Sequence, residues 1–229
     1  MKAELLGWKT TDPLREDNLV RVHSLGDGNC FFHSIISAFY IPYRERRIGG
    51  KKLDRKKFVI WLRRQLADRL TEKDENGIMI YDTLSRGTLR DHSKELRQLS
   101  LEYMINELAS NAAVDNIYVE FVSNEFNKDI YIIDERTRDV YITGMDFDIL
   151  YKKRDSIVLL YSHNHYDLLA RISADNKKHY DTLFDYKDPL IKRIRRRIRN
   201  STKKWSTKTD SWRSLGLSKC RGPIDHCPY

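Results

Sequence analysis

The most constraining feature of this sequence is a turn that stops abruptly at a cysteine. Asp27, Gly28 and Asn29 tolerate unusual backbone dihedrals, and Cys30 then opens an apolar run of helical period that continues to Tyr40. The pattern predicts that Cys30 lies in the first turn of a helix. This helix is too apolar to face water, so we expect it to be buried on most sides and to hold the sulfur rigidly.

The position of Cys30 indicates a nucleophile. Unpaired N–H groups and the positive end of the dipole favour an anion at a helix start, so this thiol should ionise more readily than one in a helix interior. Gly28 lets N–H groups point beside the sulfur, where the oxygen of an attacked carbonyl acquires charge. The loop Asp27, Gly28, Asn29, Cys30 is therefore a candidate oxyanion hole. Alternatively, Cys30 is a small buried hydrophobe after an ordinary turn.

A second segment supplies a candidate base. Residues 156–161 read as a buried strand, residues 162–164 as a turn, and residues 165–169 as a second extended piece. Side chains at i and i+2 of an extended chain share a face, so Asp167 can accept a hydrogen bond from one ring nitrogen of His165 while the other nitrogen faces the sulfur.

Three other histidines are weaker candidates for the base. His163 falls in the turn, and His33 follows Cys30 by three residues on its helix, where we expect it to pack behind the sulfur. His23 lies in a possible short strand over residues 19–23. We prefer His165 because only it is followed two residues later, in a strand, by a carboxylate.

The two motifs together resemble a known family. Asp27-Gly28-Asn29-Cys30-Phe31-Phe32, followed far downstream by an apolar strand and His165-Tyr166-Asp167, resembles the ovarian tumour (OTU) family of cysteine proteases, most of which are deubiquitinases. The resemblance covers roughly residues 18–172. It implies a papain-like fold with Cys30 as nucleophile, His165 as general base, Asp167 as third catalytic residue, and Asp27 shaping the oxyanion loop.

The remaining periodicities predict an α+β fold, with a small central sheet flanked by helices and the nucleophile at the start of a buried central helix. Helices are expected over residues 53–70, 93–109 and 117–126. Strands are expected over residues 130–133 and 140–142, beside the hairpin that carries His165. The Lys and Arg residues of the 53–70 helix are interpreted as its solvated face.

Positive charge is concentrated near the end of the chain. Its formal net charge is +9, and residues 187–204 hold nine Lys or Arg against one Asp. Together with the extent of the resemblance, this predicts three parts: an N-terminal arm (1–17), an OTU-like cysteine protease domain (18–172) and a basic C-terminal tail (173–229). Apolar residues in the tail at helical spacing predict an amphipathic helix over 189–200; they are Leu190, Ile191, Ile194 and Ile198. This helix either contacts nucleic acid, an anionic membrane or an acidic partner, or packs its apolar stripe on the body.

Composition indicates the cellular compartment and argues against a metal site. Three widely spaced cysteines do not form a disulfide framework, and no signal peptide or transmembrane run is present, so we expect an intracellular protein, cytoplasmic or nuclear. Cys220, His226 and Cys227 are too few for a zinc site. No metal or cofactor is expected.

The resemblance implies a deubiquitinase that cleaves the isopeptide or peptide bond after the C-terminal glycine of ubiquitin or a ubiquitin-like modifier. Ubiquitin or polyubiquitin would be its partner. Two alternatives stay open: a catalytically inactive ubiquitin-binding module, and a nucleic-acid-binding protein that acts through its basic tail.

Overall fold

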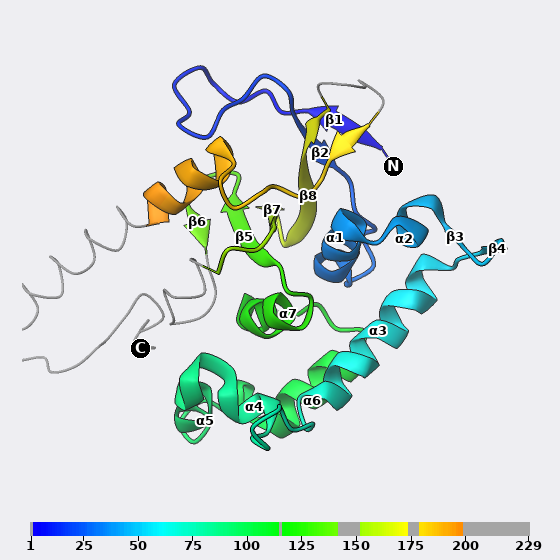
Figure 1. Cartoon of the computed structure of the whole chain (residues 1–229), viewed down its shortest axis with the longest axis vertical. Coiled ribbons are helices and arrows are strands. Elements are labelled where there is room, and N and C mark those ends of the chain that lie inside the picture. Colours follow the sequence, from blue (N-terminus) through cyan, green and yellow to red (C-terminus); the bar gives the residue numbers. More distant parts are fainter. Residues whose placement is uncertain (1, 115, 142–151, 174–178, 199–229) are drawn as a thin grey trace, which may run out of the picture.

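The protein is an α+β structure built on one mixed sheet (Figure 1). A computed structural model describes residues 2–114, 116–141, 152–173 and 179–198. The seven-stranded sheet has the order β1-β2-β8-β7-β5-β6, with β9 also paired to β8. The predicted fold class is confirmed. The strands are β1 (Ala3–Leu5), β2 (Leu19–Val22), β5 (Asp129–Asp134), β6 (Val140–Tyr141), β7 (Ser156–Ser162), β8 (His165–Ile172) and β9 (Tyr180–Asp181).

The predicted hairpin is present as β7 and β8. His163 and Asn164 connect the two strands with φ values of 50° and 59°, as a tight two-residue hairpin turn requires. Ser162 pairs with His165, so His165 opens β8. On its other side β7 pairs in parallel with β5, and β8 pairs with β2 in antiparallel fashion.

The central strands are buried on both faces. In β5, Ile130 and Ile132 contribute to one hydrophobic cluster, whereas Tyr131 and Ile133 contribute to a second cluster on the opposite face. Because both faces are apolar, the sheet needs a helical layer on each side.

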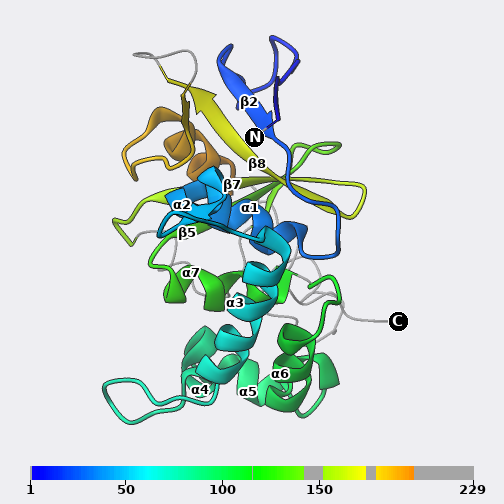
Figure 2. The same cartoon turned by 90° about the vertical axis from the view of Figure 1, so that its right-hand side faces the viewer.

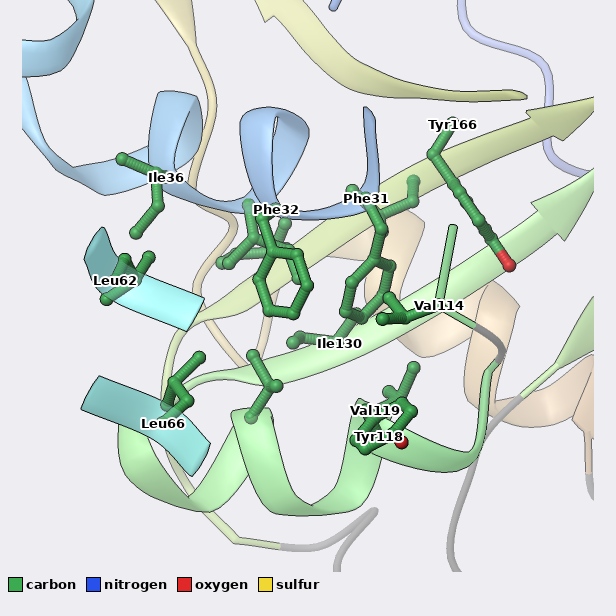
Figure 3. Packing of buried hydrophobic residues seen from close by; sticks show 14 of the residues in the cluster. Phe31, Phe32, Ile36, Leu62, Leu66, Val114, Tyr118, Val119, Ile130 and Tyr166 are labelled. Carbon is green, nitrogen blue, oxygen red and sulfur yellow. The ribbon is translucent and has the colours of Figure 1, made fainter. Parts of the chain in front are cut away.

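The first face is covered by α1 (Cys30–Phe39) and α7 (Val119–Glu125), with further helices beyond them (Figures 1 and 2). Helix α1 lies against β8 and β7 and is buried from Cys30 to Ala38. Aromatic and aliphatic side chains fill the space between these layers (Figure 3). The outer elements are α2 (Ile41–Glu45), β3 (Arg47–Ile48), β4 (Lys51–Lys52), α3 (Arg55–Arg69), α4 (Ile80–Thr83), α5 (Thr88–His92) and α6 (Leu101–Ala109).

A helix over residues 189–198 covers the second face. Its apolar stripe is buried against the sheet, together with Trp8 and Leu14 of the N-terminal segment; the stripe is Leu190, Ile191, Ile194 and Ile198. Of the two interpretations of this stripe, packing on the body is therefore confirmed. Three of the helix's arginines form ion pairs with carboxylates of the body: Arg193 with Glu16, Arg195 with Asp129, and Arg197 with Asp139.

Parts of the predicted arm and of the predicted tail contribute to the sheet and its hydrophobic clusters. β1 and Leu14 come from the predicted arm, and β9 and the 189–198 helix come from the predicted tail, yet all join the sheet or its clusters. Net charge reports on exposed side chains, whereas the apolar stripe between them determines packing. The end of the predicted tail helix, residues 199 and 200, lies outside the described residues.

The helix predicted over residues 93–109 needs correction. The helix expected over 93–109 is present only as α6, because Ser100 caps its start by accepting a hydrogen bond from the Tyr103 N–H, and residues Arg97–Leu99 form a 3₁₀ turn before it. The strand expected over 140–142 is present as β6 at Val140 and Tyr141, and Ile142 lies outside the described residues. Within the part of the chain that the structure describes, no helix has both the length and the apolar character needed to span a membrane.

Candidate active site

Cys30 occupies the predicted position at the start of α1. Asn29 precedes the first helical turn, and Gly28 adopts a positive φ of 83°. A Cβ at Gly28 would lie 3.0 Å from the carbonyl oxygen of Asn111, so the turn requires glycine both for its conformation and for this close approach. Cys30 is a free cysteine with 5% of its surface exposed.

The thiol faces backbone N–H groups from two elements. The N–H groups of Tyr166, Phe31 and Cys30 itself interact with the sulfur and favour the thiolate. Burial has the larger effect and raises the pKa of the Cys30 thiol above its ordinary value, and the nearby charge of Asp167 adds to this rise in pKa. Desolvation therefore outweighs the N–H groups at the helix start, and the comparison of this thiol with one in a helix interior stays a prediction.

His165 and Asp167 form the predicted hydrogen-bonded pair. His165 Nε2 lies 3.1 Å from Asp167 Oδ1, and Asp167 is buried. The same carboxylate oxygen accepts the Ser24 N–H at 2.9 Å. With Nε2 directed to Asp167, Nδ1 is the ring nitrogen left for the thiol, and Cε1 of the ring lies 4.0 Å from a Cβ built at Gly26, four residues before Cys30.

Tyr166 joins the hairpin to the nucleophile helix. Its N–H faces the Cys30 sulfur, and its carbonyl accepts hydrogen bonds from Ser34 Oγ at 2.9 Å and Ser24 Oγ at 2.6 Å. Its ring packs against Phe31 in an edge-on arrangement, with 5.4 Å between the centroids (Figure 3). The residue next to His165 is thus fixed directly to α1, which brings the two motifs together.

Asp27 supports the loop from the inside. Its carboxylate accepts hydrogen bonds from His33 Nε2 at 2.9 Å and from the Asn29 N–H at 3.1 Å. The Asn29 N–H is therefore occupied, so within the predicted oxyanion loop the N–H groups of Gly28 and Cys30 are the better candidate donors.

The other three candidate histidines contact groups other than the thiol. His33 is buried between Asp27 and the hydroxyl of Tyr43, and burial lowers the pKa of its imidazole. His163 is exposed at the hairpin turn and lies 2.7 Å from Ser162 Oγ. His23 contacts Asp167 Oδ2 at 3.5 Å and Glu4 at 3.4 Å, on the side of the carboxylate away from His165 Nε2.

The buried Arg63 is a residue that sequence reasoning misplaced. It lies in α3 on the face interpreted as solvated, yet it is 0% exposed. Its guanidinium donates to the carbonyls of Glu107, Leu108 and Ala112 at 2.7, 3.0 and 2.8 Å, and to the side-chain oxygen of Asn29. Arg63 therefore ties the cysteine loop to the last turn of α6 and to the segment that follows it. No local sequence signal distinguishes it from its exposed neighbours.

No metal centre is found among the described residues, which contain no group of three or more His, Cys, Asp or Glu side chains placed to hold an ion. Cys220, His226 and Cys227 lie outside the described residues.

Comparison with known proteins gives matches among solved structures alone. No protein-family model and no curated protein matches the chain. An OTU domain solved in complex with ubiquitin is 14% identical, with a TM-score of 0.48, over 78% of this chain and 81% of that chain. The viral OTU domain protease from Taggert virus is 20% identical, with a TM-score of 0.43, over 70% of this chain and 84% of that chain. An OTU deubiquitinase from Wolbachia pipientis wMel bound to ubiquitin is 13% identical, with a TM-score of 0.34, over 68% and 98%.

These solved structures are OTU domains, the family that the two sequence motifs resemble. We base the functional proposal on the geometry of the site.

Proposed function

We propose that the protein is a thiol-dependent hydrolase that cleaves the bond after the C-terminal glycine of ubiquitin or a ubiquitin-like modifier. The observation that carries this proposal is the contact of the Cys30 sulfur with the N–H of Tyr166, directly after a histidine that is oriented by Asp167. Nucleophile, base and orienting carboxylate come from two segments that are more than 130 residues apart in the sequence.

The reaction begins with proton transfer. His165 Nδ1 takes the proton of the Cys30 thiol as the sulfur attacks the glycine carbonyl carbon, and the carbonyl electrons move to the oxygen. Because burial raises the pKa of the thiol, this transfer accompanies the attack and does not precede it as a stable ion pair. The N–H groups of Gly28 and Cys30 stabilise the oxyanion.

The intermediate then collapses to a thioester. The carbon–nitrogen bond breaks, its electron pair goes to the leaving amine, and the imidazolium of His165 donates the proton from Nδ1. Water then attacks the thioester with His165 again acting as base, which releases the glycine carboxylate and restores the Cys30 thiol. Asp167 stabilises the positive imidazolium in both halves of the reaction.

The proposal is tested with ubiquitin that carries a C-terminal electrophile. We expect a covalent adduct on Cys30, identified by intact mass and peptide mapping, and no adduct with Cys30→Ala. In diubiquitin cleavage, His165→Ala should lower kcat/KM by at least about 100-fold, since general base catalysis contributes about that factor or more. His163→Ala is the matched control, because this histidine is exposed and, among the described residues, its side chain is hydrogen-bonded to Ser162, its neighbour in the turn.

Absence of an adduct, while a reference deubiquitinase reacts with the same reagent, would overturn the hydrolase proposal. Ubiquitin binding that persists in such a protein would instead support the alternative of an inactive binding module. If His163→Ala abolished cleavage and His165→Ala retained it, the general base would be His163 and not His165.

A further inference from the structure

The hydroxyl of Ser24 lies within hydrogen-bond distance of two groups at the site. Its Oγ is 2.6 Å from the carbonyl oxygen of Tyr166 and 3.1 Å from Nε2 of His165. A carbonyl oxygen can only accept, so the single hydroxyl proton of Ser24 points to Tyr166. Toward His165, Ser24 Oγ is therefore left with its lone pairs and must accept.

The direction of the Ser24 hydroxyl proton determines which nitrogen of His165 carries the imidazole proton. His165 Nε2 faces two acceptors, Ser24 Oγ and Asp167 Oδ1, each at 3.1 Å. Neither can donate to the ring while Asp167 is ionised and the Ser24 proton is engaged, so Nε2 carries the proton and shares it between them. Nδ1 is then the unprotonated nitrogen, which is the form that can accept a proton from a thiol.

We propose that Ser24 is a positioning residue that, together with Asp167, holds His165 in the tautomer with the proton on Nε2. This inference rests on the proposed function for its kinetic consequences, although the tautomer itself does not depend on any substrate. Ser24 contributes through three bonds: its hydroxyl bridges His165 and the Tyr166 carbonyl, and its N–H holds Asp167 Oδ1 at 2.9 Å.

A consequence is that the carboxylate is partly redundant in setting the tautomer. When Asp167 is replaced by Ala, Ser24 Oγ still accepts from Nε2, because its own proton remains directed to Tyr166. Only loss of both acceptors frees the imidazole to place its proton on Nδ1. The effects of the two replacements on the tautomer should therefore be strongly non-additive.

The chain offers a matched control in Ser34. Its hydroxyl also donates to the Tyr166 carbonyl, at 2.9 Å, but it comes from α1 and has no bond to His165 in the described structure. Ser34→Ala removes one hydrogen bond to the same carbonyl and leaves the acceptor at His165 in place. Ser24→Thr retains the hydroxyl and serves as the conservative variant.

The first test is the tautomer, read from nitrogen-15 chemical shifts of His165 at a pH where the ring is neutral. We expect the proton on Nε2 in the wild type, in Ser34→Ala and in Asp167→Ala, and a mixture of tautomers in the double variant Ser24→Ala/Asp167→Ala. Conversion to the other tautomer in Asp167→Ala alone would overturn the proposal, as would a double variant that keeps the wild-type tautomer.

The second test is kinetic. With a fluorogenic ubiquitin substrate, Ser24→Ala should fall about tenfold below Ser34→Ala in kcat, with KM little changed, since one hydrogen bond to the reacting base is worth about that factor. Ser24→Thr should recover most of this loss, and equal rates for Ser24→Ala and Ser34→Ala would contradict the role. If the wild type shows no turnover, the hydrolase proposal fails while the tautomer measurement still decides the role of Ser24.

Discussion

Cys30 is held where its ionisation is opposed by burial and helped by three N–H groups. Because burial prevails, the pKa of the thiol lies above its ordinary value, and the thiolate population of the free protein at neutral pH is small. We expect iodoacetamide to modify Cys30 slowly at pH 7, with a rate that rises at a higher pH in the folded protein than in urea-unfolded protein. Peptide mapping by mass spectrometry isolates Cys30 from the other cysteines. If the modification rate of Cys30 rose at a lower pH in the folded protein than in the unfolded protein, the raised pKa of the thiol would be contradicted.

His33 should make stability depend on pH. Burial lowers the pKa of its imidazole in the folded protein, so the unfolded chain binds a proton first as the pH falls through about 6.5. The contribution of His33 to stability is therefore present above that pH and lost below it. His33→Gln keeps a donor for Asp27 but does not titrate, so we expect its free energy of unfolding to decline less between pH 7 and pH 5.

Urea unfolding at a series of pH values measures this difference. His163→Gln is the control, because His163 is exposed and its replacement should leave the pH dependence of the wild type unchanged. A His33→Gln curve parallel to the wild-type curve would show that other groups cause the decline.

At the scale of elements, the turn before α1 depends on one glycine and not on the other. Gly28 has φ +83° and a neighbouring carbonyl oxygen 3.0 Å from a built Cβ, whereas a Cβ at Gly26 meets its nearest atom at an ordinary 4.0 Å. We expect Gly28→Ala to lower the free energy of unfolding by about 2 kcal/mol, since a left-handed conformation alone costs an L-residue about 1–2 kcal/mol. Gly26→Ala should change it little in urea denaturation, and equal losses would refute the distinction.

Arg63 gives a second test at this scale. Arg63→Met leaves the carbonyls of Glu107, Leu108 and Ala112 without their donor, so we expect a loss of about 3 kcal/mol in the free energy of unfolding. Arg64→Met is the matched control on the exposed side of the same helix and should stay within about 0.5 kcal/mol. A small loss at Arg63 would mean that water replaces the guanidinium.

Some of these elements were predictable from sequence because their signals are local. Turn formers before an apolar run predict α1, and an apolar run followed by a turn at residues 162–164 predicts the hairpin that carries His165 and Asp167. Ser24 and Arg63 were not predictable, because their importance comes from carbonyls and rings brought together by the fold. The role of His33 was not predictable either. Its partner Asp27 is close in sequence, but its burial depends on elements distant in sequence that pack against α1.

At the scale of the whole molecule, the helix over residues 189–198 completes the core. Ile194 is 0% exposed and packs in the second cluster, so Ile194→Ala should cost about 3 kcal/mol in the free energy of unfolding. Arg196→Ala, on the exposed side of the helix, is the control. Chemical denaturation measures both, and an unchanged midpoint for Ile194→Ala would show that this helix is not needed for stability.

This packing also shows why a protein shortened at residue 172 would be a poor subject for activity measurements. Such a chain would expose the apolar face formed by Tyr131, Val158 and Leu169, which the helix covers in the intact protein. A test of nucleic-acid binding by the basic segment should therefore exchange exposed charges, such as Lys192 and Arg196, and keep the helix.

Strand β1 has a practical implication for anyone who prepares this protein. Its Glu4 lies 3.4 Å from His23, which is itself 3.5 Å from the carboxylate of Asp167, so the first few residues reach the site through two contacts of His23. An affinity tag joined ahead of Met1 would lie only two residues before this short edge strand. Turnover measured on a preparation tagged at that end should therefore be compared with turnover of the same protein after tag removal.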